Sequence, residues 1–450
     1  MHLIYENVLK LLIGLWTGDG AKGLDTGRED YELSKAVWEA IGQSTAAAGS
    51  TIPSVYGSRV PNVAQDRSLL SAEMWAFWGC YIAPTLLRQR FTQDKYYRHF
   101  VRLVCLINVC LQFEITKAQV GELRKGLAAW VVDFERIYYQ HDPQRAAVCT
   151  LNVHALLHIA DSIELCGPVW CYWAFPMERY CCSLQPALRS RRFPWASLDR
   201  FVVEQAQLTQ VKWLYNIAEE LRLAPPPRRL EEIADDTCIL LPPRRMQPLA
   251  AGLANALVGA LSTRFDVTVK RIRQHLRFDL IEEYGRVRRI DSTEGDTICA
   301  ASMRDAQMED GRDASYVRYE AYVDKNQRQK KHAVKLQLRT FYGQLQHLLV
   351  VHFPEPCLAL HLTEPQSFIF AAIRQCKVNG SGLQSLGLDV RFYSEQGPLD
   401  VVDIMSVQCL VGRIYDRGQW AIIDRSGDLV RAVPEDDDGS QFNDDDNIDV

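Results

Sequence analysis

Several features are missing from the sequence, and each absence narrows the class of protein. The longest apolar run, Leu103 to Phe113, is too short to span a bilayer, so we expect no membrane partner. Glu6 and Lys10 interrupt the first apolar run and no basic segment precedes it, unlike a secretory leader. No Cys-x-x-Cys pair, the spacing of many structural zinc sites, occurs. The thirteen cysteines are therefore predicted to be reduced, mostly buried thiols of a soluble intracellular protein.

Negative charge is concentrated at the C-terminus. The chain has a net charge of −5, but residues 434–450 carry eight acidic side chains and no basic one. Removing those eight charges from −5 leaves +3 for the rest of the chain, a mildly basic balance that permits DNA contact without requiring it. The acidic tail itself is predicted to be disordered.

The composition, 47% hydrophobic and 24% charged over 450 residues, is typical of a globular chain with two or three domains. We predict an α+β protein with a mostly helical part over 1–223, a Pro/Arg-rich linker over 224–248 and an accessory domain over 249–433. The accessory domain is expected to begin with short helices and to become a β-rich, barrel-like domain with strands at about 315–432. The main helices are predicted at residues 2–16, 34–41, 94–112, 116–140 and 199–223.

The stretch from Cys149 to Arg192 concentrates the residue types that carry chemistry. His154 and His158 are four residues apart, so a helix places them one turn apart, where they could hold one ion or one partner. Glu178 follows Pro176, a residue suited to the first helical turn, so its carboxylate should project from a helix start. The stretch also contains a cluster of basic residues: Arg179, Arg189, Arg191 and Arg192.

These motifs resemble a known family. The stretch resembles the C-terminal part of the catalytic region of CACTA (En/Spm-type) DNA transposases, in the form common in fungal genomes. The similarity lies in three motifs followed by basic residues: H-x-x-x-H at 154–158, G-P-V-W at 167–170 and W-x-F-P-M-E-R at 173–179. The opening MHLIYENVLK resembles another block of the family, and the similarity runs in order over most of residues 1–220. The β-rich region resembles the accessory β domain that follows the catalytic region in this family.

The resemblance implies a DDE-type enzyme with an RNase H-like core. Such enzymes cut and join DNA with two Mg²⁺ ions held between three carboxylates. It implies that Glu178 is the third of these carboxylates and that the arginine cluster contacts DNA phosphates. The partners implied are transposon ends and other transposase chains, in the nucleus, with no small-molecule substrate.

The sequence departs from the family at its start. The second catalytic aspartate belongs to a D-x-M-H block, and this chain enters that block at Met1 and His2. We therefore expect two of the three carboxylates to be missing, as in a truncated protein that is inactive alone. In related recombinases the histidine pair, together with a Cys-x-x-Cys, binds a structural zinc ion. Here His154, His158 and His2 would be the ligands, with Cys149 or Cys166 completing the site.

Each assignment has a simpler alternative. Glu178 could form an ion pair with Arg179 or Arg189, or could stabilise a helix start. The two histidines could be a buried pair bonded to the backbone or to carboxylates, and the arginines could be a solvated face. For the whole chain, the alternative is a non-catalytic DNA-, chromatin- or protein-binding module derived from a transposon.

Overall fold

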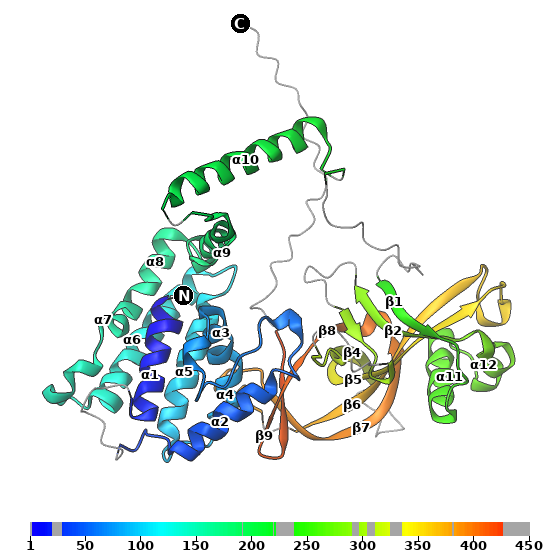
Figure 1. Ribbon diagram of the computed structural model, residues 1–450. Helices are drawn as coiled ribbons and strands as arrows, with labels where there is room; N and C mark the ends of the chain where they lie inside the picture. Colours follow the sequence, from blue (N-terminus) through cyan, green and yellow to red (C-terminus); the bar gives the residue numbers. More distant parts are fainter. Residues whose placement is uncertain are drawn as a thin grey trace, which may run out of the picture.

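The computed structural model describes residues 2–19, 29–190, 192–218, 220–221, 238–289, 297–303, 311–324, 335–379 and 382–425. These residues form a helical N-terminal part and a curled antiparallel sheet in the C-terminal part (Figure 1). The predicted α+β class is confirmed at this level. Within the described ranges, no helix is both long and apolar enough to cross a membrane. The acidic tail at 434–450 lies outside them.

The helical part begins with a π-helical segment, η1 (His2–Val8), which continues directly into α1 (Leu9–Thr17) and so forms the predicted first helix. The helix predicted near residue 116 has the expected capping box, with Thr116 and Gln119 bonded to each other's backbone N–H. The other main helices are α2 (Lys35–Ala48), α3 (Ala72–Phe77), α4 (Ala83–Leu86), α5 (Asp94–Cys110), α6 (Lys117–Phe134), α7 (Leu151–Ala155), α8 (Ile159–Cys166), α9 (Phe175–Leu184) and α10 (Pro194–Tyr215).

A reciprocal pair of hydrogen bonds joins α5 to α6 in the core of the helical part. The Nε2–H of His99 donates to the carbonyl of Trp130 at 3.1 Å, and the Nε1–H of Trp130 donates to the carbonyl of His99 at 2.9 Å. The two rings stack with centroids 4.3 Å apart, and both side chains are buried. Because the carbonyl can only accept, the ring of His99 is held as the tautomer with the proton on Nε2.

The sheet of the C-terminal part has ten described strands, and all of its pairs are antiparallel. The long central strand β5 carries β6 along one edge and shares the other edge between β4 and β2. The strands are β1 (Cys238–Arg245), β2 (Glu282–Arg289), β3 (Thr297–Cys299), β4 (Tyr316–Asp324), β5 (Leu336–Phe353), β6 (Gln366–Asn379), β7 (Arg391–Asp403), β8 (Val407–Leu410), β9 (Gly412–Asp416) and β10 (Gln419–Ile423).

The sheet curls because the continuous segment from β8 to β9 pairs with two strands that lie far apart in the strand order. β8 pairs with β4, whereas β9 pairs with β10, and only Val411 separates β8 from β9 in the sequence. The strip that runs from β4 through β5, β6, β7 and β10 must therefore bend until its first and last strands reach neighbouring residues. Figure 1 shows this curvature in β6 and β7. α11 (Ala251–Phe265) and α12 (Val269–His275) cover a separate apolar patch that includes Leu349 and Phe370.

The helical part and the sheet share one hydrophobic core. Phe392 of β7, Ile414 of β9, and Ala421 and Ile423 of β10 belong to the same buried cluster as the helices. The side chain between the last two, Ile422, lies in a different cluster. Because neighbouring side chains of a strand point to opposite faces, one face of this part of the sheet packs against the helical part. The accessory region is therefore not an independent barrel on a tether.

Polar contacts reinforce this junction. The segment after α2 behaves as an extra partner of the sheet: the N–H of Asp313 donates to Ser50 O at 2.9 Å, and the N–H of Arg413 donates to Thr51 O at 3.1 Å. The side chain of Arg413 forms a buried ion pair with Asp313 at 2.8 Å. The same two residues thus connect with each other through their side chains and with the helical part through their backbones.

Two sequence-based predictions are wrong in part. Residues 238–245 of the predicted linker form the edge strand β1, which buries Cys238, Leu240 and Leu241; prolines are tolerated there because an edge strand leaves some N–H groups unpaired. With β2 and β3, strands thus begin well before residue 315. The cysteines are all free, but they are not mostly buried: Cys149, Cys166, Cys171, Cys181 and Cys182 are exposed.

The His99–Trp130 pair predicts a pH-dependent stability. Burial lowers the pKa of His99 from 6.5 to about 4, although its hydrogen bond to Trp130 favours the charged ring. Between these values the unfolded chain takes up a proton and the folded chain does not. The free energy of unfolding therefore decreases as the pH is lowered from 6.5 to 4, by roughly 3 kcal/mol in total. His99→Gln keeps an N–H donor, and we expect its unfolding free energy to lose roughly 3 kcal/mol less between pH 7 and pH 4 than that of the wild type.

Urea unfolding at a series of pH values measures this difference. His275→Gln is the matched control, because His275 is exposed at the end of α12 and should leave the acid dependence unchanged. Equal pH dependence in wild type and His99→Gln would contradict the assignment of a neutral, buried ring.

Candidate functional site

The fold brings His2 to Glu178, although 176 positions separate them in the sequence. Glu178 lies in the first turn of α9, with Pro176 beside it at the helix start, as the sequence predicts. The Nε2 of His2 lies 3.1 Å from Oε1 of Glu178, and its Nδ1 contacts Glu6. Both nitrogens can donate to these carboxylates at once only when the ring is protonated.

The contact lies at the surface. The side chains of His2 and Glu178 are 65% and 44% exposed, so the ion pair itself contributes little to stability. Its position is set by packing: Tyr5 and Val8 of η1 are buried, and η1 packs against α3 and α7. The ion pair that the sequence allowed between Glu178 and Arg189 is not among the contacts of the described side chains.

His154 and His158 face each other near the junction of α7 and α8. Their Nε2 atoms are 3.3 Å apart, and both residues are exposed, so the alternative of a buried pair is wrong. Asp161 and Glu164, the nearby acids, bind Arg124 instead. A separation of about 3.3 Å is what two nitrogen ligands of one tetrahedral zinc ion would have, given Zn–N bonds of about 2.0–2.1 Å.

The donor sets do not complete a metal site. Across the described residues, no group of three or more His, Cys, Asp or Glu side chains is arranged to hold a metal ion. The nitrogens of His154 and His158 lie at a separation that suits zinc, but the third ligand that the resemblance implies, His2, is engaged by Glu6 and Glu178. For Mg²⁺, Glu178 is the one described carboxylate to which the resemblance gives a metal-binding role, and hard divalent ions need several oxygen ligands. The residues described here fit neither ion as a complete site.

The structure describes two of the four arginines of the cluster in full. Arg189 and Arg192 are exposed, and Arg192 lies over the ring of Phe193 with its guanidinium 5.3 Å from the ring centroid. Among the described side chains, no carboxylate forms an ion pair with either of them. The side chain of Arg179 and the whole of Arg191 lie outside the described residues. The segment between α9 and α10 thus presents two cations to solvent.

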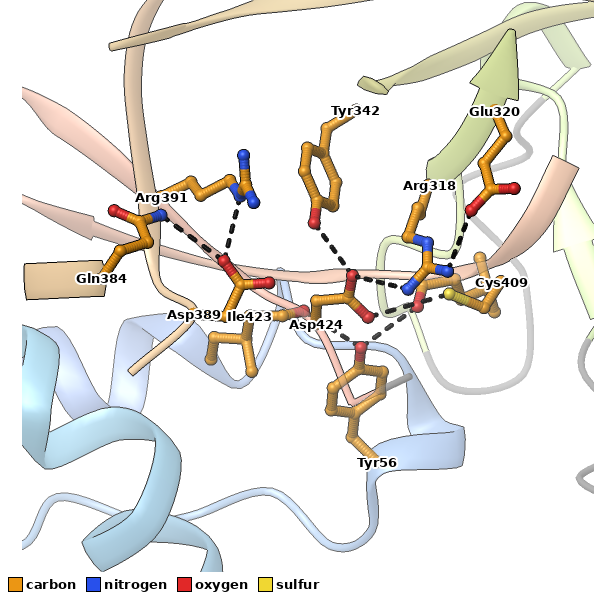
Figure 2. Close-up of polar contacts among 11 residues, drawn as sticks. Tyr56, Arg318, Glu320, Tyr342, Gln384, Asp389, Arg391, Cys409, Ile423 and Asp424 are labelled. Carbon is orange, nitrogen blue, oxygen red and sulfur yellow. Dashed lines mark hydrogen bonds and ion pairs between the residues drawn. The ribbon is translucent and has the colours of Figure 1, made fainter. Parts of the chain in front are cut away.

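A buried carboxylate at the junction was not predicted from the sequence (Figure 2). Asp424 accepts hydrogen bonds from Tyr342 at 3.0 Å and from Arg318 at 3.5 Å. Beside it, the hydroxyl of Tyr56 reaches the carbonyls of Leu410 and Ile423, at 3.1 and 3.0 Å. Burial, followed by the charge of Asp424, raises the pKa of Tyr342, which keeps this phenol a donor. The cluster fixes the end of β10 against the helical part.

A second unpredicted cluster surrounds Glu283 on β2. Its carboxylate accepts from His347 at 2.7 Å, from Ser302 at 2.6 Å and from Arg245 at 3.3 Å. Burial alone would raise the pKa of Glu283, but the hydrogen bonds from His347 and Ser302 outweigh it and the pKa is lowered. Ser302 and His347 bind the same carboxylate oxygen, which differs from the serine–histidine–acid relay of hydrolases. The cluster anchors the loop after β3.

Aromatic side chains of the sheet surround a cation that belongs to the chain itself. The guanidinium carbon of Arg413 lies 3.4 Å from the ring centroid of Tyr316 and 4.4 Å from that of Trp420. Tyr393 accepts a hydrogen bond from Arg413 at 3.1 Å. Aromatic cages of this kind bind cationic ligands in other proteins. Here Arg413 fills the space, so the cage is part of the fold.

Comparison with known proteins gave no identification: no protein-family model, no curated protein and no solved structure matched this chain.

The junction cluster predicts a specific loss of stability. Tyr56→Phe removes one hydroxyl and leaves two buried carbonyls, of Leu410 and Ile423, without it. We expect the free energy of unfolding to fall by about 1–3 kcal/mol. Tyr322→Phe is the control, because Tyr322 is 69% exposed on β4 and its hydroxyl should be worth less than about 0.5 kcal/mol. Chemical denaturation measures both, and equal midpoints for the two variants would contradict the role assigned to Tyr56.

Proposed function

We propose that this chain is a DNA-binding protein derived from a CACTA-type DDE transposase. The parent activity is Mg²⁺-dependent strand transfer at phosphodiester bonds, carried out on an RNase H-like core. The observation that carries the proposal is the contact between His2 and Glu178.

This contact supports the proposal because the resemblance assigns both residues to the catalytic region. His2 matches the histidine next to the family's second aspartate, and Glu178 matches its third carboxylate. Carboxylates that share metal ions must converge from distant parts of the chain. The contact of 3.1 Å brings together two residues that lie 176 positions apart, as such a convergence would. Local sequence patterns alone do not pair them.

The proposed function of the chain itself is binding and not cleavage. Within the described residues, the family carboxylates are represented by Glu178, with Glu6 as a neighbour across His2. One family carboxylate cannot assemble a two-metal centre, so we assign no cleavage step to these residues. DNA phosphates would be contacted by the exposed Arg189 and Arg192, which extend from the segment next to Glu178 in the sequence. A protein with this role would act in the nucleus.

DNA binding and its salt dependence test the proposal. Each phosphate contact that is lost reduces the slope of log K against log salt concentration by about 0.9. We expect the double variant Arg189→Gln/Arg192→Gln to bind duplex DNA more weakly, with a slope smaller by about 2, as measured by fluorescence anisotropy.

The control is the double variant Arg271→Gln/Arg273→Gln on α12, which removes the same charge from another exposed part of the chain. Its slope should stay close to that of the wild type. Equal slopes in all three proteins would exclude the arginine pair from the DNA contact, and an absence of binding at low salt would refute the DNA-binding function.

A further inference from the structure

α10 is a long helix with an apolar surface that the rest of the described chain leaves uncovered. Its 22 residues include no buried side chain, and its main contact is with the short turn η9 (Gln185–Ala187) at its N-terminal end. Figure 1 shows it projecting from α9, away from the other helices and from the sheet. Trp195 is 76% exposed and Trp213 is 80% exposed. Helices in globular proteins owe most of their stability to a packed apolar face, so this face needs a partner.

The apolar residues form a stripe that is symmetric about the centre of the helix. At about 100° per residue, Trp195, Val202, Ala206 and Trp213 fall on one face. Trp195 and Trp213 lie nine positions on either side of Glu204, and Val202 and Ala206 lie two positions on either side. When two such helices pack antiparallel about a two-fold axis at Glu204, each tryptophan faces the other tryptophan of its partner. Val202 then faces Ala206.

We propose that α10 is a dimerisation helix whose partner is α10 of a second copy of this chain, packed antiparallel about a two-fold axis. A two-fold interface uses the same surface on both copies and must be self-complementary, which the stripe is. The charges agree with this arrangement: Asp199 would lie opposite Thr209, and Lys212 opposite Ala196. Glu204, on the axis itself, lies about 180° around the helix from the stripe and points away from the interface, so that no like charges meet.

The available area suits a weak dimer. Two tryptophans at these exposures supply roughly 350 Å² per chain. Val202, which lies on the same face and is 40% exposed, raises this to about 400 Å² per chain. The pair would bury about 800 Å² in total, which is below the range of stable specific interfaces and suits a weak, reversible one.

Segments of the same chain are poorer candidates for covering the stripe. The stretch from 222 to 237 is rich in proline, arginine and acidic residues, and the stretch from 426 to 450 is dominated by aspartate. Neither sequence offers an apolar surface that matches two tryptophans about 27 Å apart along a helix. The inference is independent of the proposed DNA binding, since it concerns a different surface and a different measurement.

Analytical ultracentrifugation of the full chain, over about a hundredfold range of concentration, tests the proposal. We expect a monomer–dimer equilibrium that Ala206→Glu weakens by more than about tenfold, because it buries two unpaired carboxylates at the centre of the interface. Gln207→Glu is the matched control, because it adds the same charge at the next exposed position, on another face, and should change the dissociation constant by less than about twofold. A wild type that stays monomeric, or equal effects of the two variants, would overturn the proposal.

A double-mutant cycle tests the antiparallel register. If Trp195 packs against Trp213 of the partner, the variant Trp195→Ala/Trp213→Ala should weaken dimerisation less than the product of the two single effects. Independent effects would overturn this register. Hydrogen exchange of the α10 amides completes the test: protection should appear only with dimerisation, and protection in a monomer would mean that the chain covers its own helix.

Discussion

The buried ion pair between Arg413 and Asp313 is the interaction on which the arrangement of the two parts depends. A buried guanidinium is costly unless its donors are satisfied and its charge is balanced. Here Asp313 provides the charge, Tyr393 accepts a hydrogen bond, and the rings of Tyr316 and Trp420 enclose the cation. Among the described residues its Nε has no hydrogen-bond acceptor, so the charge balance and the rings provide the remaining stabilisation. The backbones of Arg413 and Asp313 bind Thr51 and Ser50 of the helical part. The ion pair that stabilises this part of the sheet is therefore also where the sheet binds the helical part. Loss of Arg413 or Asp313 should destabilise both the sheet and its junction with the helices.

Periodicity predicted the elements whose signal is local. The apolar spacing in residues 2–16 and the capping residues Thr116 and Gln119 depend on neighbours within a few positions, and the helices that they predict are present. The strand β1 was not predicted because Pro242, Pro243 and the two arginines after them made the segment look like a linker, although its first half is apolar and buried. The shared core was missed for another reason: Phe392 and Ile423 show the alternation of any strand, and only the tertiary structure reveals that one of their faces meets helices.

The candidate site divides in the same way. The contact of His2 with Glu178 could not be predicted from local patterns, since none links residues so far apart; the resemblance implied only that both belong to the catalytic region. Asp424 and Glu283 were not predicted, because their partners come from separate strands: each looks in the sequence like an ordinary surface acid. Arg413 looks like a solvated charge in a turn-rich segment, yet it is buried. A buried charge can be recognised only when all the groups that balance it are known.

Surfaces with a structural role can be told from surfaces available for binding by whether their charged and aromatic side chains already have partners within the chain. The sheet has an aromatic cage, but Arg413 occupies it, and the acids Asp424 and Glu283 are saturated by donors of the chain itself. Few of these charged and aromatic groups are therefore available to bind a ligand. The opposite holds at the other end of the helical part, where Arg189, Arg192 and the tryptophans of α10 face solvent. Large apolar side chains left in water gain free energy when a partner covers them, and exposed cations attract anionic ligands, so this end is where partners should be sought.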